Sequence, residues 1–268
     1  MRHPTQHCRN LAALAALLGA CGAAQAQAFD AVRIFGPVEG DGAGTVGAVV
    51  IAAPRYMGSD ERGWLAVPSI DYRWKNGWFA GLSNGIGYLF PSRPDMQYGL
   101  RVTADLGRKA SRSDALAGMG NIHPRAEAGA FFNYFPTREI FLTSSLRYGA
   151  GNDWNGLQID LGAGVTTALA PQWRGTIGVA TTYVNGAYMQ AYFGVTPEQS
   201  ASSGYAVYTP GAGIRDVRLN ASLVYAIDAR WSITGALTVS SLQSDTRDSP
   251  IVFEPTGVSG IVALSYGF

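Results

Sequence analysis

The last eleven residues of the chain, Val258 to Phe268, alternate between two faces. One face is mostly apolar and the other is mostly small or polar, and the chain ends on an aromatic residue with another aromatic residue two places before it. A period of two predicts a β-strand. A strand that turns apolar residues outward and ends in this way is typical of the closing strand of an outer-membrane β-barrel, so it predicts a membrane protein. The apolar face consists of Val258, Gly260, Val262, Leu264, Tyr266 and Phe268.

The amino-terminal region has the pattern of a secretory signal peptide. Arg2 and Arg9 precede an apolar run at 11–24, and small residues around Ala26 then offer cleavage sites. We therefore expect a signal peptide at 1–26 and one domain at 27–268. The run is shorter than the roughly 20 apolar residues that a membrane-spanning helix needs, so insertion would use strands. Alternatively, residues 18–21 resemble a lipobox in which Cys21 would become the acylated first residue.

The composition fits a barrel and disfavours other classes. The chain has 34 glycines, 11% aromatic residues and only 15% charged residues, which suits an inner wall of small side chains and an outer wall with aromatic girdles. The formal net charge is +1 without runs of like charge, so no nucleic-acid partner is expected. Both cysteines, Cys8 and Cys21, lie in the expected signal peptide, which leaves no thiol for a disulfide or a metal site. We expect no cofactor.

Alternation recurs along the whole mature chain. It predicts an all-β, transmembrane, antiparallel β-barrel of about twelve strands, because an even number lets both termini lie in the periplasm. Tryptophans fall at the ends of these segments, where rings can lie at headgroup level: Trp64, Trp74, Trp78, Trp173 and Trp231. The expected strands lie near 43–55, 64–74, 77–90, 97–107, 125–136, 138–149, 156–170, 172–184, 187–196, 212–226, 230–242 and 257–268.

The connections between these segments set the expected orientation. Short turns at 75–77 and 228–230 would lie in the periplasm, and the longer stretches at 196–211 and 243–255 would be extracellular. One connection, 109–123, is long but falls on the periplasmic side of this scheme. Either the strand count slips there or the segment has a function, such as docking a partner.

The faces opposite the apolar ones carry Gly, Ser, Thr and a sparse set of charged residues, nearly balanced in sign. A soluble β-sandwich or small barrel also alternates, but its second face would be richly charged for solvent, so a barrel with internal charge pairs is favoured. Inward aromatic residues, Phe79, Phe131, Phe141, Tyr188 and Tyr192, predict a narrow or plugged lumen. The expected polar residues of the lumen are Asp71, Arg73, Arg101, Asp105, Glu127, Arg147, Asp160, Arg174 and Arg218.

Apparent catalytic motifs have simpler interpretations. The run at 42–47 fits a dinucleotide fingerprint but leads into a strand and not a helix. The run at 81–85 fits a nucleophile elbow, yet Ser83 would lie within an alternating strand and face the lumen. His123 is the one histidine after the signal peptide, in a loop, and Asp71 and Asp160 are interleaved with arginines. We therefore expect no enzyme activity and no catalytic residues.

Six segments, in order, resemble the MltA-interacting protein (MipA/OmpV) family of Gram-negative outer-membrane proteins. The likeness extends from about residue 45 to the end of the chain. The segments are Ala53 to Asp60, Val67 to Tyr72, Gly107-Arg108 with Leu116, Gly118 and Ile122, Ala191 to Thr196, Tyr208 to Gly213, and Asp248 to Val252.

The resemblance implies a non-enzymatic scaffold that links a murein hydrolase, a lytic transglycosylase, with a murein synthase, a penicillin-binding protein. Other members of the family resemble adhesins or routes for small solutes, so a narrow channel and a surface adhesin stay open as alternatives. One departure from the family is the segment 109–113, which is basic and rich in serine where more acidic residues are expected.

The location and the closing strand imply two further partners. We expect the barrel to contact outer-membrane lipid and to be inserted by the barrel-assembly machinery. That machinery would recognise Tyr266 and Phe268 at the carboxyl terminus.

Overall fold

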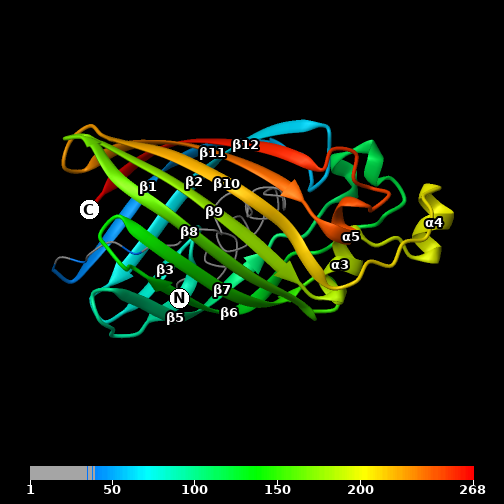
Figure 1. Ribbon diagram of the computed structural model, residues 1–268, viewed down its shortest axis with the longest axis horizontal. Coiled ribbons are helices and arrows are strands. Elements are labelled where there is room, and N and C mark those ends of the chain that lie inside the picture. Colours follow the sequence, from blue (N-terminus) through cyan, green and yellow to red (C-terminus); the bar gives the residue numbers. More distant parts are fainter. Residues whose placement is uncertain (1–34, 36–37, 39) are drawn as a thin grey trace, which may run out of the picture.

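Twelve antiparallel strands pair edge to edge and close into a barrel (Figure 1). The computed structural model describes residues 35, 38 and 40–268. Each strand lies beside its neighbours in the sequence, and the first strand pairs with the last. The predicted class, an all-β transmembrane barrel of about twelve strands, is confirmed. The expected signal peptide at 1–26 and the alternative lipobox lie outside the described residues.

The two ends of the barrel differ, because one carries short turns and the other carries long loops with helical elements. None of the helices in the described part of the chain has the length and apolar character to cross a membrane. The strands are β1 (Gly42–Pro54), β2 (Arg62–Trp74), β3 (Trp78–Gly81), β4 (Gly85–Leu89), β5 (Met96–Asp105), β6 (Arg125–Tyr134), β7 (Ile140–Ala150), β8 (Gly156–Ala170), β9 (Trp173–Val184), β10 (Gly213–Ala226), β11 (Trp231–Leu242) and β12 (Thr256–Gly267). The helical elements are η2 (Ala110–Arg112), η3 (Asp114–Leu116), α3 (Gly186–Phe193), α4 (Pro197–Ser203) and α5 (Ser244–Arg247).

Burial follows the alternation of the strands. In β12, Val262 and Leu264 are exposed on the outer wall, whereas the preceding residue, Ile261, is buried. Exposed valine, leucine, isoleucine and aromatic side chains recur around the outer wall, as a lipid-facing band requires. The tryptophans at the strand ends, Trp64, Trp74, Trp78, Trp173 and Trp231, are all exposed.

Two predicted strands were wrong, and the errors cancel in the count. The segment 77–90 forms two strands, β3 and β4, because the chain turns at 82–84 and Gly85 adopts a positive φ of 74°. Ser83 therefore lies in a turn, not within a strand, and its hydroxyl donates to Asp71 Oδ2 at 2.7 Å.

The segment 187–196 forms helix α3 where a strand was expected. The Asn185 side chain accepts a hydrogen bond from the Tyr188 amide at 3.0 Å and caps the amino end of the helix. Four bulky residues of α3 are buried. Packing in the barrel mouth thus overrides the alternation in the sequence. A segment of only eight residues can alternate in polarity and still form a helix.

The split of 77–90 moves the 109–123 connection to the opposite end of the barrel from the predicted one. The short-turn end is formed by the connections 75–77, 90–95, 135–139, 171–172 and 227–230, together with the start of β1 and the end of β12. The long-loop end is formed by 55–61, 106–124, 151–155, 185–212 and 243–255. The two ends lie at the left and right of Figure 1, with α3, α4 and α5 at the right. Segment 109–123 thus lies at the same end as the other long loops, so the first of the two alternatives holds: the predicted strand count slips before this segment.

The pairing of β2 with β3 is incomplete. β2 spans thirteen residues and pairs with β1 along its whole length, but it pairs with β3 only through 71–73. On the other side of the hairpin, β4 pairs with β5 through 99–102. The β3–β4 hairpin is therefore short and fills only the part of the wall nearest the short-turn end.

Deleting Phe268 should slow assembly of the barrel. Its backbone exchanges two hydrogen bonds with Gly44, of 2.9 and 3.0 Å, and its ring stacks on Tyr72. We expect less of the heat-modifiable folded band on gels of outer-membrane fractions. Phe253→Ala removes an exposed ring at the long-loop end and serves as the control. An unchanged folded band after the deletion would contradict a role of the terminal residue in closure.

Candidate functional site

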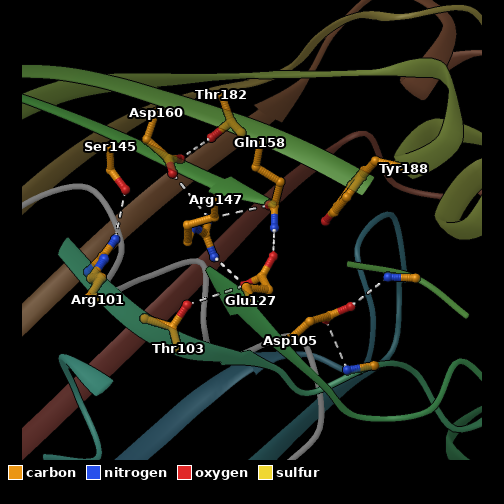
Figure 2. Close-up of polar contacts among 12 residues, drawn as sticks. Arg101, Thr103, Asp105, Glu127, Ser145, Arg147, Gln158, Asp160, Thr182 and Tyr188 are labelled. Carbon is orange, nitrogen blue, oxygen red and sulfur yellow. Dashed lines mark hydrogen bonds and ion pairs between the residues drawn. The ribbon is translucent and has the colours of Figure 1, made fainter. Parts of the chain in front are cut away.

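The lumen contains a charge network that joins five strands. Arg147 on β7 lies at its centre and donates to Glu127 Oε2 at 3.4 Å, Gln158 Oε1 at 3.3 Å and Asp160 Oδ2 at 3.1 Å. Gln158 in turn donates to Glu127 Oε1 at 2.8 Å. Figure 2 shows these side chains pointing toward one another from β6, β7 and β8.

The network continues onto β9 and β10. Asp160 Oδ1 accepts from Thr182 at 2.6 Å and from Arg218 at 3.2 Å. Arg215 donates to Asp216 Oδ2 at 2.6 Å, and Arg218 pairs with Asp216 Oδ1 at 3.2 Å. Three arginines thus meet three carboxylates, all buried, so the charges of the network cancel. Buried charges need such pairing, because an unpaired ion in a medium of low polarity is costly.

The predicted lumen residues divide into two groups. The network brings together Glu127, Arg147, Asp160 and Arg218. Arg101 lies nearby and donates to the Ser145 hydroxyl at 2.7 Å. The others are separate: Asp71 and Arg73 are half-buried on β2, Arg174 is exposed near the short-turn end of β9, and Asp105 binds elements of the long-loop end.

The prediction missed Gln158, Thr182, Arg215 and Asp216. Gln158 and Thr182 are uncharged, and nothing in the sequence marks them from other polar residues of their strands. Arg215 and Asp216 are adjacent, and both are buried because a bulge in β10 shifts the register between Ile214 and Asp216. Strict alternation would place one of them outside, so the pattern gives no signal for the pair.

Aromatic side chains fill the lumen nearer the short-turn end. Phe79, Phe131 and Phe141 are buried, and the Phe35 ring packs against those of Phe79 and Phe131 at 4.8 and 5.5 Å. Glycines opposite these rings make the room: a Cβ at Gly87 would collide with the Phe79 ring. Gly99 faces Phe131 and Gly164 faces Phe141 in the same way.

The mouth at the long-loop end is covered by a cap, which consists of α3 and the segments 55–61, 106–124, 194–212 and 243–255. Tyr192 of α3 donates to both oxygens of Asp105, at 2.6 Å for Oδ2. Asp105 also accepts from the amides of Gly107 and Gly151 at 3.0 Å. Burial and the Asp105 carboxylate raise the pKa of Tyr192 well above its ordinary value of 10.0, so the hydroxyl remains a donor.

Further contacts tie the cap together. The Arg108 guanidinium donates to the Tyr192 carbonyl at 2.7 Å, and burial lowers the pKa of Arg108 to about 10, so it is still charged at neutral pH. The Tyr56 hydroxyl donates to the Ile251 carbonyl at 3.0 Å, and Ser249 donates to the Phe193 carbonyl at 2.6 Å. The cap thus connects loops that are distant in the sequence. His123 is exposed in this region.

The terminal aromatic residues lie at the short-turn end. The Tyr266 hydroxyl accepts from Arg230 at 2.9 Å, and its ring lies 5.0 Å from that of Trp231. Phe268 is exposed. Tyr266 is half-buried, and the role of both residues as an assembly signal stays a prediction.

Asp160→Ala should strongly destabilise the barrel, because it leaves Arg147 and Arg218 without a shared carboxylate. Removal of one partner from a buried ion pair typically costs about 3–5 kcal/mol. The measurement is urea unfolding of the protein in lipid vesicles. Asp71→Ala, which removes a half-buried carboxylate with one hydrogen bond to Ser83, should cost about 1 kcal/mol. Equal losses for the two variants would contradict the importance of the network.

The purified protein should carry little ionic current in planar bilayers, because rings, ion pairs and α3 occupy the lumen. Tyr192→Phe removes the donor that holds α3 to Asp105 and should increase the frequency of opening. Tyr205→Phe, which removes a hydroxyl contact to Ala115 in the outer part of the cap, is the matched control. Since the raised pKa keeps the Tyr192 hydroxyl protonated, currents of the parent should not change between pH 6 and 9. Large, stable currents from the parent would overturn this interpretation.

Comparisons with known proteins agree with the sequence resemblance. The family described as MltA-interacting protein MipA matches residues 46–268. The MltA-interacting proteins of Escherichia coli (strain K12) and Shigella flexneri are each 26% identical over 200 residues, which cover 69% of this chain and 74% of the relative. Among solved structures, a KdgM porin has a TM-score of 0.46 at 11% identity and covers 83% of this chain and 99% of its own. The toluene transporter TodX of Pseudomonas putida has a TM-score of 0.42 at 10% identity and covers 94% of this chain and 93% of its own.

Proposed function

Because the chain belongs to the MltA-interacting protein (MipA) family, we propose that it is a scaffold of the Gram-negative outer membrane. In this role it brings a lytic transglycosylase and a penicillin-binding protein together for peptidoglycan assembly, without enzyme activity of its own. The observation that carries the proposal is the family match over 46–268, supported by two relatives named for their interaction with MltA.

The filled lumen supports a scaffold over a wide pore. The charge network, the buried phenylalanines and α3 lie in series along the barrel, and each is fixed by its own contacts. A protein that exposes two ends of a rigid cylinder can hold partners without a conducting path. The narrow channel and the surface adhesin remain the alternative proposals.

We place the docking surface for wall enzymes at the short-turn end. With both strand termini in the periplasm, this end faces the peptidoglycan, whereas segment 109–123 faces outside with the other long loops. The short-turn end carries exposed charges of both signs, which suit a polar interface rim. They are Asp41, Lys75, Arg93, Arg138, Glu139, Arg174, Asp228 and Arg230.

Photo-crosslinking in intact cells tests this arrangement. A crosslinking amino acid at Asn76 or Ala229, in the tight turns, should capture a lytic transglycosylase and a penicillin-binding protein, which mass spectrometry identifies. The same group at Ser111, exposed in the cap, is the matched control and should capture neither.

Each other outcome has a defined meaning. Capture of wall enzymes from Ser111 alone would refute the orientation. Capture from none of the three positions, in cells where all variants show the heat-modifiable folded band, would count against the scaffold and favour the channel or adhesin alternatives.

A further inference from the structure

We propose a lateral opening in the barrel wall between β2 and β5, which binds an amphiphile with a single apolar chain that enters from the membrane. The proposal goes beyond the scaffold role and does not depend on it. It rests on the strand pairing, on the chemistry of the exposed strand edge and on the apolar side of the lumen behind it.

The β3–β4 hairpin starts at the short-turn end and ends before it reaches the long-loop end of the wall. Beyond its turn at 82–84, none of the strand pairings among the described residues occupies the β3 side of Arg62–Ser69. On the facing strand, β5 continues from Thr103 to Asp105 past its last pairing with β4. The missing part of two strands leaves three strand spacings of about 4.8 Å, so β2 and β5 would lie about 14 Å apart there. This width suits extended chains and not a folded domain.

The unpaired edge lies at membrane depth. Trp64 and Trp74 lie near the two ends of β2, and both are exposed on the outer wall as girdle residues are. The edge from Ala66 to Ser69 lies between them. Backbone at this depth is tolerated only when it is covered by protein or faces a wet cavity, because an unpaired amide in hydrocarbon costs several kcal/mol. The opening must therefore hold water or a molecule with hydrogen-bonding groups.

The backbone geometry identifies which groups face the opening. The Ile70 carbonyl accepts from the Leu82 amide, so Ile70 faces the hairpin side of β2. Backbone groups of alternate residues in an antiparallel strand face the same neighbour, so those of Pro68, Ala66 and Trp64 also face this side. On β5, the Tyr98 carbonyl accepts from the Phe90 amide, which by the same rule turns the Ala104 backbone toward the opening.

Pro68 disfavours a peptide strand as the occupant. It lacks an N–H, and it lies in the middle of the unpaired edge where an added strand would need a donor. Proline on an exposed edge is a common protection against strand addition. The remaining groups, the N–H of Ala66 and Trp64 and several carbonyls, can bind water or a small polar head group.

The lumen behind this edge is apolar. The side of the wall made by β1, β2, β11 and β12 carries a cluster centred on Val49, Ile51 and Ile261, and Val67 of β2 packs against it. The ion-pair network lies on the opposite side, on β6 to β10. An apolar chain that enters along β2 would meet this cluster, whereas the β5 side of the opening is polar, since Thr103 there donates to Glu127 Oε2 at 3.5 Å. A hydrocarbon chain with a polar head satisfies both the cluster and the strand edge.

The opening is bounded on both sides along the barrel axis, which favours one chain over a two-chain lipid. The hairpin turn with the exposed Leu82 forms the boundary on the short-turn side. On the long-loop side, Arg55 after β1 donates to the Arg112 carbonyl of the cap at 2.7 Å, which joins the two sides of the mouth. A single chain can pass between these boundaries end on, whereas a bulky phospholipid head group would stay outside.

Amide hydrogen exchange in lipid bilayers, followed by solid-state NMR, tests the open edge. The amides of Trp64 and Ala66 should exchange on the order of a hundredfold faster than those of Leu65 and Val67, which face β1. Addition of stearic acid should slow exchange at Trp64 and Ala66 alone. Equal protection of all four amides without any addition would mean that the wall is closed, by a strand of this chain or of a second copy, and would overturn the proposal.

Fluorescence quenching identifies the occupant. Residues 27–268 contain no cysteine, so a single labelled cysteine reports one position. Val67→Cys faces the lumen beside the edge, and Ala48→Cys, on the outer face of β1 opposite Pro68, is the lipid-facing control. Brominated stearic acid should quench the Val67→Cys label saturably, at low mole fraction, and the Ala48→Cys label in proportion to its amount. Brominated phosphatidylcholine should quench only the control label.

Two results would contradict this assignment. Quenching of the Val67→Cys label by phosphatidylcholine as strongly as by stearic acid would mean that bilayer lipid, not a free amphiphile, fills the opening. Absence of quenching at Val67→Cys by both, with normal quenching at Ala48→Cys, would mean that no chain enters. Neither result bears on the scaffold role, because the positions expected to capture wall enzymes, Asn76 and Ala229, lie in the tight turns at the short-turn end.

Discussion

Backbone hydrogen bonding without water is the constraint on which this structure depends. A strand in lipid has to pair on both sides, and closure of β1 on β12 removes the edges that an open sheet would leave. The terminal residues take part directly, since Gly44 and Phe268 exchange hydrogen bonds at the seam. The same constraint applies to the stretch of β2 that lacks a pairing with β3 among the described residues, because its unpaired backbone groups need water or a ligand.

Filling the lumen follows from closure. In the aromatic part of the lumen, phenylalanine rings pack against glycines, and Gly164 leaves room for the Phe141 ring. The charged part is packed by ion pairs that cancel, and the cap then covers the mouth. The segments that carry the family resemblance meet in this cap, as the contacts of Tyr56 with Ile251 and of Ser249 with Phe193 show. The exception is Val67 to Tyr72, which includes the unpaired edge of β2.

The sequence predicts the class of fold well, because a period of two repeated along the chain has few physical solutions. It predicts individual elements less well where local chemistry or tertiary packing competes with the period. Gly85 ends one strand and starts another within a run that reads as continuous, and α3 packs its large residues into the mouth despite an alternating pattern. Charged residues on the inner face are predictable one by one, but their partners are not. The bulge that turns both Arg215 and Asp216 inward has no signature in the sequence.

The inner wall is divided lengthwise into two halves. Strands β6 to β10 carry the paired charges, and β1, β2, β11 and β12 carry the apolar cluster around Ile51. The charged half is rigid, since each carboxylate has several donors at fixed positions. The aliphatic side chains of the apolar cluster make no such directional contacts, and this is the half beside which the wall is incomplete. A barrel built in this way can keep a fixed shape for partners at its short-turn end while one side of its wall admits a chain from the membrane. Different strands of one sheet thus provide the rigid, charged part of the wall and the proposed entry for a chain from the membrane.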